Sequence, residues 1–134
     1  MVTSPARSPL SFATGLRVRD PVFIDHVEFR PSEFQVLVDG ARAGLTIREF
    51  QILEVLAERH DRVVQRPEIY DLVWGGQMPT RDRSVDVFVR KVRRKLAAVS
   101  PDWTYVHTHF GVGYRFAPER VLSVAEPVAD VAPA

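Results

Sequence analysis

The stretch RDRSVDVFVRKVRRKL, residues 81–96, limits what this chain can fold into more than any other. If successive residues advance by about 100°, as in an α-helix, one apolar set falls within about 60° of a single direction. The set consists of Val85, Phe88, Val89, Val92 and Leu96. The stretch therefore predicts an amphipathic helix over residues 81–99, with one side in the core.

The opposite side of this helix is basic and carries Arg83, Val87, Arg90, Lys91 and Arg94, so Val87 is exposed among cations. Arginine can bond a guanine edge or a phosphate with two N–H groups, and a small apolar side chain can contact a thymine methyl. The helix alone leaves two interpretations open, a solvated cationic face and a surface that reads the major groove of DNA.

The charge of the chain is concentrated in the same place. Residues 81–95 hold seven Lys/Arg and two Asp, a net +5, while the whole chain has +1, so the remainder carries −4. A single cationic element on an acidic body favours nucleic acid or an acidic surface as partner.

Several classes of function are disfavoured by what the chain lacks. There is no cysteine, which excludes disulfides, thiolate metal sites and a cysteine nucleophile. No apolar run approaches the ~20 residues that span a bilayer, and residues 1–16 lack the apolar stretch of a signal peptide. We expect a cytoplasmic protein without membrane contact.

Neither a metal site nor an enzyme is indicated. His107 and His109 would share a face of one strand, but no third ligand is evident nearby, so we expect no metal and no cofactor. The chain has no phosphate-binding glycine loop, no nucleophile elbow and no paired carboxylates in an obvious cleft. Asp82 and Asp86 are instead expected to support the first turn of the basic helix and to orient its arginines.

The remaining segments predict strands, three helices and a hairpin. VFIDHVEF and EFQVLV, followed by Asp39–Gly40, favour three or four short antiparallel strands. In LTIREFQILEVLAERH, Thr46 and Glu49 form a capping box, and Leu45 and Phe50 have the spacing of a hydrophobic staple.

A second helix is expected over residues 66–75, with Pro67 in its first turn. Ile69, Leu72 and Val73 would be its buried side, and Gly75–Gly76 would end it. Thr80 would cap the basic helix. WTYVHTHFGVGYRF predicts two strands around a glycine-bearing turn. Residues 1–20 and 118–134 are expected to be flexible segments around one domain, 21–117.

A helix, a connector and a basic helix followed by a hairpin have the order of a winged helix-turn-helix. In that fold one helix enters the major groove and the hairpin contacts the flanking backbone or minor groove. The context therefore favours nucleic-acid binding, within an α+β fold.

Four segments in this order, TIREFQILEVL, LVWGG, RDRSVDVFVRKVRRKL and GVGYRF, resemble the effector domain of OmpR/PhoB-type response regulators over about residues 22–117. The resemblance implies a four-stranded N-terminal antiparallel sheet, a three-helix core, a C-terminal β-hairpin wing, and bacterial transcription regulation through promoter DNA. It also implies a head-to-tail pair on direct DNA repeats.

By the same resemblance, the recognition helix presents Arg83, Ser84, Val87, Phe88, Arg90, Lys91 and Arg94 to DNA. Lys91 takes a position where the family often has a base-reading arginine. Trp74, Thr108 and Tyr114 match positions that commonly contact phosphates. The loop formed by Gly75, Gly76, Gln77, Met78, Pro79 and Thr80 matches the one that contacts RNA polymerase in activators of the family.

The chain also departs from the family pattern. Phe110 stands where an arginine is usual in the wing, so it would pack, contact sugars or wedge at a base step. Phe88 replaces a histidine, and Gln65 replaces the Ser/Thr cap of the second helix. No receiver domain is in the sequence, which fits either a stand-alone regulator or an excised effector domain. A rival interpretation from another class is a winged-helix interaction module that docks an acidic partner.

Overall fold

The computed structural model describes residues 21–121, which form two antiparallel sheets, three α-helices and a short 3-10 helix (Pro31–Glu33). The first sheet has its strands in chain order: β1 (Val22–Ile24), β2 (Val27–Arg30), β3 (Gln35–Val38) and β4 (Ala41–Arg42). The helices are α1 (Ile47–Glu58), α2 (Arg66–Val73) and α3 (Ser84–Val99). The second sheet has the order β5-β7-β6, made of β5 (Val64–Gln65), β6 (Trp103–His109) and β7 (Gly113–Arg120). The predicted fold class is confirmed.

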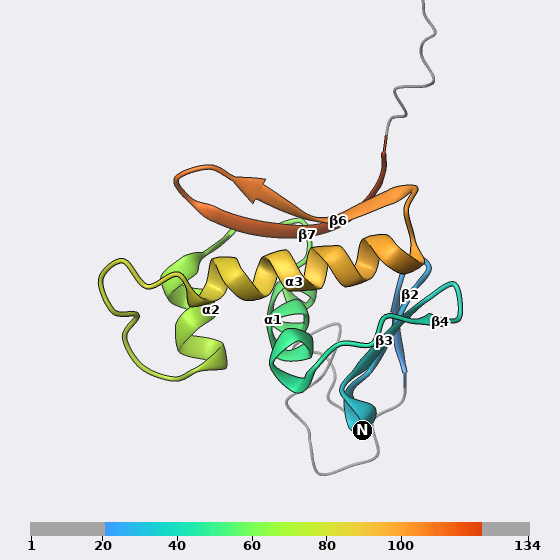
Figure 1. Ribbon diagram of the computed structural model, residues 1–134, viewed down its shortest axis with the longest axis horizontal. Helices are drawn as coiled ribbons and strands as arrows, with labels where there is room; N and C mark the ends of the chain where they lie inside the picture. Colours follow the sequence, from blue (N-terminus) through green and yellow to red (C-terminus); the bar gives the residue numbers. More distant parts are fainter. Residues whose placement is uncertain (1–20, 122–134) are drawn as a thin grey trace, which may run out of the picture.

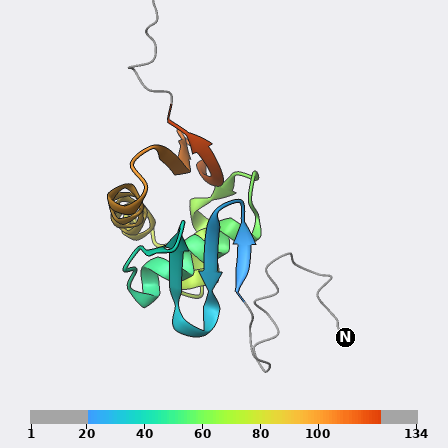
Figure 2. The same ribbon diagram turned by 90° about the vertical axis from the view of Figure 1, so that its right-hand side faces the viewer.

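Helix α3 crosses the molecule beneath the β6–β7 hairpin, with its N-terminal end near α2 and its C-terminal end near the first sheet (Figure 1). Figure 2 looks onto that sheet, with α3 seen end-on beside it. The turn of the hairpin therefore lies at the end of the molecule away from the four-stranded sheet, on the side where α3 begins.

The local signals for α1 and for the β3–β4 turn are confirmed. Thr46 Oγ1 accepts from the Glu49 backbone N–H at 3.3 Å, and Glu49 Oε1 accepts from the Thr46 N–H at 2.9 Å, which completes the capping box. Asp39 and Gly40 both have positive φ, 50° and 84°, as a type I′ hairpin turn requires.

The core joins the first sheet to α1 and the hairpin through aromatic residues. Phe29 of β2 lies edge-on to Phe50 of α1 and to Phe116 of β7, with ring centroids 6.5 and 5.9 Å apart. All three side chains are fully buried. The wing is thus part of the same core as the helices, which fixes its direction relative to α3.

Several expectations about helix ends were wrong. Helix α3 begins at Ser84 rather than at residue 81, and Thr80 does not cap it. The N-cap residue is Arg83, without a side-chain cap, and Asp82 Oδ1 accepts from the Ser84 backbone N–H at 2.7 Å, which is the expected support of the first turn. Helix α2 ends at Val73, and Leu72 is 47% exposed rather than buried.

The second sheet is larger than predicted: one strand is longer and one further strand joins it. Strand β7 continues to Arg120, three residues past the expected limit at 117. Strand β5, just before α2, was not predicted because two residues carry no strand pattern; it pairs Val64 with Tyr114. The expected flexible segment 1–20, and the expected tail after residue 121, lie outside the described residues.

Candidate nucleic-acid interface

The apolar side of α3 packs into the core as predicted. Val85, Val89, Val92 and Leu96 are at most 3% exposed. Phe88 is only half-buried, and its ring lies edge-on to Trp74 at 5.7 Å. This residue therefore sits at the border between the core and the outer face of the helix.

The outer face of α3 carries the predicted cations around Val87. Val87 is 41% exposed, and Arg83, Arg90, Lys91 and Arg94 are all exposed. Within residues 21–121, Arg90 and Arg94 have no hydrogen-bond or ion-pair partner. The Lys91 ammonium lies 4.9 Å from the centroid of the Phe88 ring. The side chains that could meet a polyanion are thus gathered on one helix face.

Two further cations of α3 turn inward instead. Arg93 donates from Nε to the Val106 carbonyl at 3.0 Å and from Nη2 to Thr108 Oγ1. Lys95 donates to Glu49 Oε1 at 2.8 Å and to the Gly44 carbonyl at 3.1 Å. These contacts fasten α3 to the wing and to α1, so not every cation of the basic stretch is available to a partner.

The carboxylate of Asp86 joins α2, α3 and the wing. Its Oδ1 accepts from Arg66 Nε at 2.7 Å and from the Tyr114 hydroxyl, and its Oδ2 lies 3.4 Å from Arg83 Nε. Burial opposes ionisation, yet the hydrogen bonds from Tyr114 and Arg66 outweigh it and lower the pKa of Asp86. Asp86 is therefore ionised and fixed in place by Arg66 and Tyr114, and it orients Arg83 as expected.

Sequence reasoning missed Arg66 and Arg93 as organisers of this interface. The Arg66 guanidinium lies 5.0 Å from the Tyr114 ring centroid, and that of Arg93 lies 5.5 Å from the same centroid. Arg66 is twenty residues from Asp86 in the chain, so no helical or strand spacing links them. Only the packing of α2 against α3 brings the pair together.

Of the residues assigned to phosphates, Trp74 and Thr108 are half-buried and Tyr114 is buried. Trp74 follows α2, stacks on Tyr70 at 5.1 Å and lies under the Arg48 guanidinium at 5.0 Å. Tyr114 is 4% exposed, and its hydroxyl is bonded to Asp86. Burial, aided by that hydrogen bond, raises the pKa of Tyr114.

The wing tip is a tight turn in which the Val112 N–H donates to the His109 carbonyl at 2.9 Å. Gly111 has a φ of 77°, which a side chain would strain. Phe110 is 90% exposed and Val112 is 46% exposed. The alternative that Phe110 packs against its own chain is therefore wrong, because nothing of the described residues covers it.

The loop 75–80 lies between α2 and α3 and is exposed except for half-buried Met78. Gly75 and Gly76 have φ values of 88° and 95°, and the Gly76 N–H donates to Asp71 Oδ1 at 2.8 Å. The loop begins directly after Trp74. The segment between α2 and α3 lies beside the N-terminal end of α3 (Figure 1).

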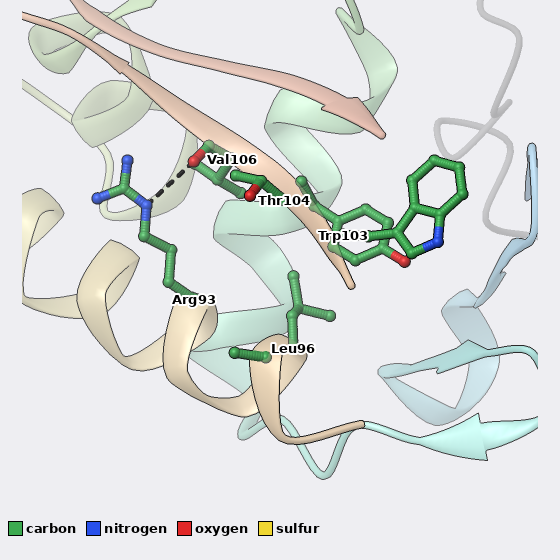
Figure 3. Close-up of a pocket in the computed structure, with 7 residues that line it drawn as sticks. Arg93, Leu96, Trp103, Thr104 and Val106 are labelled. Atoms are coloured by element: carbon green, nitrogen blue, oxygen red, sulfur yellow. Dashed lines mark hydrogen bonds between the residues drawn. The ribbon is translucent and has the colours of Figure 1, made fainter. Parts of the chain in front are cut away.

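A pocket of about 220 Å³ lies between α3 and β6 (Figure 3). It is lined by Arg93, Leu96, Ala97, Trp103, Thr104, Tyr105 and Val106. At one end Arg93 is bonded to the strand, as the dashed line shows, and Trp103 stands at the other. Between these ends the lining is mostly apolar, with Thr104 as a polar member, and its charged group, Arg93, is already bonded to Val106.

No three His, Asp or Glu side chains of residues 21–121 are grouped so that they could hold a metal ion. His107 Nε2 is bonded to the Ala117 carbonyl at 2.8 Å, and His109 Nε2 accepts from Arg115 Nε at 3.1 Å. In the same part of the chain, no helix is long and apolar enough to cross a bilayer.

Comparison with curated proteins gives relatives over most of this domain. A family model described as "Transcriptional regulatory protein, C terminal" matches residues 40–116. The transcriptional regulatory protein CreB of Escherichia coli K12 is 35% identical over 91 residues, covering 68% of this chain and 40% of that protein. The response regulator ArlR of Staphylococcus haemolyticus is 34% identical over 96 residues, covering 72% and 43%. The chain thus spans less than half the length of these relatives.

Solved structures with the same fold cover a similar share of this chain. The DNA-binding domain of Klebsiella pneumoniae RstA, in complex with the RstA box, has a TM-score of 0.65 at 26% identity and covers 73% of this chain and 97% of that one. The DNA-binding domain of CpxR from E. coli has a TM-score of 0.64 at 27% identity, covering 72% and 95%. The chain therefore belongs to the transcriptional regulatory protein C-terminal family, as a winged-helix, DNA-binding effector domain of the OmpR/PhoB type.

Proposed function

We propose that this domain binds double-stranded promoter DNA in a sequence-specific manner, with α3 in the major groove and the β6–β7 hairpin on the flanking backbone. The observation that carries the proposal is the outer face of α3, where Val87 is exposed among Arg83, Arg90, Lys91 and Arg94. The likeness to the RstA domain in complex with its DNA box supports it. The site of action would be the bacterial cytoplasm, in transcription regulation.

The residues divide by chemistry. Arg83, Arg90 and Arg94 supply charge to phosphates or guanine edges, and Lys91 and Val87 read base edges. Ser84 and half-buried Phe88 border this face. Trp74 and Thr108 are proposed phosphate contacts. The same role for Tyr114 requires its hydroxyl to leave Asp86, so we assign Tyr114 the support of the wing in the free domain.

Partners beyond DNA are proposals of the same kind. The 75–80 loop is exposed beside the start of α3, which suits a contact with RNA polymerase on a neighbouring promoter element. A head-to-tail pair on direct repeats would double the contacts with DNA. Since the relatives are more than twice as long as their matched part, a receiver domain is proposed as the element that regulates these contacts in them.

The test is selection of bound duplexes from a random DNA pool, followed by affinity measurements between 50 and 200 mM salt. We expect an enriched motif, a half-site spacing if two copies bind, and an affinity that falls steeply with salt because phosphates release counterions. If no motif is enriched while an acidic protein competes for the α3 face, the domain is an interaction module instead.

A further inference from the structure

Three aromatic rings lie against one another at the border of the α3 face. Trp74, directly after α2, is stacked on Tyr70 with ring centroids 5.1 Å apart, and it lies edge-on to Phe88 of α3 at 5.7 Å. The Arg48 guanidinium of α1 lies 5.0 Å from the Trp74 centroid and donates to the Val73 carbonyl at 3.0 Å. The Phe88 ring is therefore supported from α2 and, through Trp74, from α1.

Lys91 is the exposed cation of α3 that contacts this cluster. Its ammonium lies 4.9 Å from the centroid of the Phe88 ring, three residues earlier in the helix. Arg90 and Arg94 share the same face, but within residues 21–121 they have no ring, hydrogen-bond or ion-pair partner. A cation over an aromatic ring at an exposed site is favoured by about two- to fivefold over other positions. The side chain of Lys91 is therefore restricted, whereas those of its two neighbours are not.

From these contacts we infer that Phe88 is a positioning residue, whose ring holds Lys91 so that the ammonium meets O6 and N7 of one guanine in the major groove. The inference rests on the proposed DNA binding and adds the base that Lys91 reads and the residue that places it. Guanine presents two adjacent acceptors in that groove, and a lysine ammonium has only donors. A side chain that is restricted before binding also loses less conformational freedom when it meets the base.

The competing role for Phe88 is packing alone, since its side chain is half-buried against the core. Packing depends on apolar volume, which leucine largely retains. The attraction for an ammonium depends on the negative face of an aromatic ring, which leucine lacks and tyrosine keeps. The two roles therefore separate when Phe88→Leu is compared with Phe88→Tyr.

The experiment measures the affinity of the full chain for a duplex obtained by selection, in which each guanine is replaced in turn. The analogue 7-deazaguanine has C–H in place of the N7 acceptor, whereas inosine lacks only the 2-amino group in the minor groove. At one guanine, 7-deazaguanine should weaken wild-type binding about tenfold, and inosine should leave it nearly unchanged. Lys91→Ala should bind the guanine and 7-deazaguanine duplexes equally well at that position.

The variants of Phe88 then test its role. In Phe88→Leu the penalty for 7-deazaguanine should fall from about tenfold to about threefold, because the held position of Lys91 is no longer favoured, and Phe88→Tyr should keep the full penalty. Phe88→Met is a second non-aromatic variant and should match Phe88→Leu; thermal unfolding establishes that each is folded. In the Lys91→Ala background, Phe88→Leu should leave the response to 7-deazaguanine unchanged, because Phe88 acts through Lys91.

Phe34→Leu is the matched control. Phe34, directly after the 3-10 helix, is 38% exposed and lies edge-on to another ring, that of Phe50, at 5.8 Å. The substitution removes a partly exposed ring with an aromatic neighbour, as at Phe88, but away from α3. Phe34→Leu should therefore keep the tenfold penalty.

A full tenfold penalty in folded Phe88→Leu or Phe88→Met would reduce Phe88 to packing and overturn the inference. The same conclusion would follow if wild type tolerated 7-deazaguanine at every position, or if Phe34→Leu lost discrimination as much as Phe88→Leu. Failure of the proposed function looks different, since wild type would then enrich no duplex at all.

Discussion

The Tyr114 hydroxyl, in β7, donates a hydrogen bond to the Asp86 carboxylate in the first turn of α3. Arg66 of α2 donates to the same oxygen at 2.7 Å. One anion therefore sets the spacing between the wing, the basic helix and the helix before it. A change at this point alters stability and interface geometry together.

Replacing Tyr114 by Phe should lower the free energy of unfolding by about 1 kcal/mol, because the buried ring stays while one hydrogen bond to a charged group is lost. Urea denaturation measures this. Tyr70→Phe is the control, since the Tyr70 hydroxyl has no hydrogen-bond partner within residues 21–121. Equal stability of Tyr114→Phe and wild type would contradict a structural role for the Asp86 contact.

Stability should fall in acid through Glu49. Desolvation raises the pKa of this buried carboxyl, but the hydrogen bonds from Lys95 and the Thr46 backbone outweigh it, so the pKa is lower than its ordinary 4.5. A lowered folded-state pKa contributes stability that is present above pH 4.5 and is lost as pH falls through the folded value. Glu49→Gln should therefore show a flatter loss of unfolding free energy below pH 4.5.

Glu58→Gln gives the opposite sign and serves as the contrast. Burial raises the pKa of Glu58 in spite of Arg59, so its ionisation in the folded state is unfavourable. As pH falls through the raised pKa, Glu58 becomes protonated and the free energy of unfolding of wild type should rise. Glu58→Gln should show no such rise. Identical pH profiles of the two variants would show that neither carboxyl is shifted.

Lys91→Ala should relax discrimination at one or two base pairs, at a cost of about 1–3 kcal/mol on the preferred site. Its side chain is exposed on the outer face of α3, with the ammonium 4.9 Å from the Phe88 ring centroid, on the face that the proposed function turns toward base edges. Affinities for all single-base variants of the selected site measure this. Arg120→Ala, at the remote end of the hairpin, is the control; a parental preference profile for Lys91→Ala would exclude it as a base reader.

Val87 should contact a thymine methyl. Replacing the thymines of the site by uracil, one at a time, should weaken binding about fourfold at one position, the value of one buried methyl group. Val87→Ala should bind the thymine and uracil duplexes equally well. A position that stays methyl-sensitive in the variant must be read by another residue.

Gly113→Ala should destabilise the domain by about 1–3 kcal/mol through overpacking. An added Cβ would lie 2.0 Å from the Val64 carbonyl oxygen, which belongs to the backbone of β5 and cannot rotate away. Thermal unfolding measures the loss. Val112→Ala, at the preceding residue, which is 46% exposed, should shift stability by less than about 0.5 kcal/mol.

The sequence predicted those parts of the fold that have local signals. The capping box of α1 and the Asp39–Gly40 turn lie within a few residues, so their geometry follows from spacing. The separation of Val87 from Val85 and Val89 follows from the helical repeat. Asp82 supports the first turn of α3, as expected, by accepting from the Ser84 N–H, but the helix begins three residues later than predicted and Thr80 does not cap it.

The parts of the interface that sequence did not reveal depend on contacts between distant segments. Arg93 lies within the basic run and looks like its neighbours, yet it turns to Val106 and Thr108 once β6 packs on α3. Leu72 has helical spacing with Ile69, but no neighbour among residues 21–121 covers the outer side of α2, and Leu72 is 47% exposed. Phe110 lies in a turn and belongs to no periodic pattern, so the sequence could not predict its exposure of 90%.

Among the described residues Asp86 has three partners, and these differ in solvent exposure. Arg66 and Tyr114 are largely enclosed, whereas the Arg83 side chain is 73% exposed and 3.4 Å away. If Arg83 left this carboxylate for a phosphate, Arg66 would still neutralise Asp86 and the Tyr114 hydroxyl would still donate to it. Under the proposed binding mode, this exchange would need the rotation of one exposed side chain while the contacts that join α2, α3 and the wing stay in place.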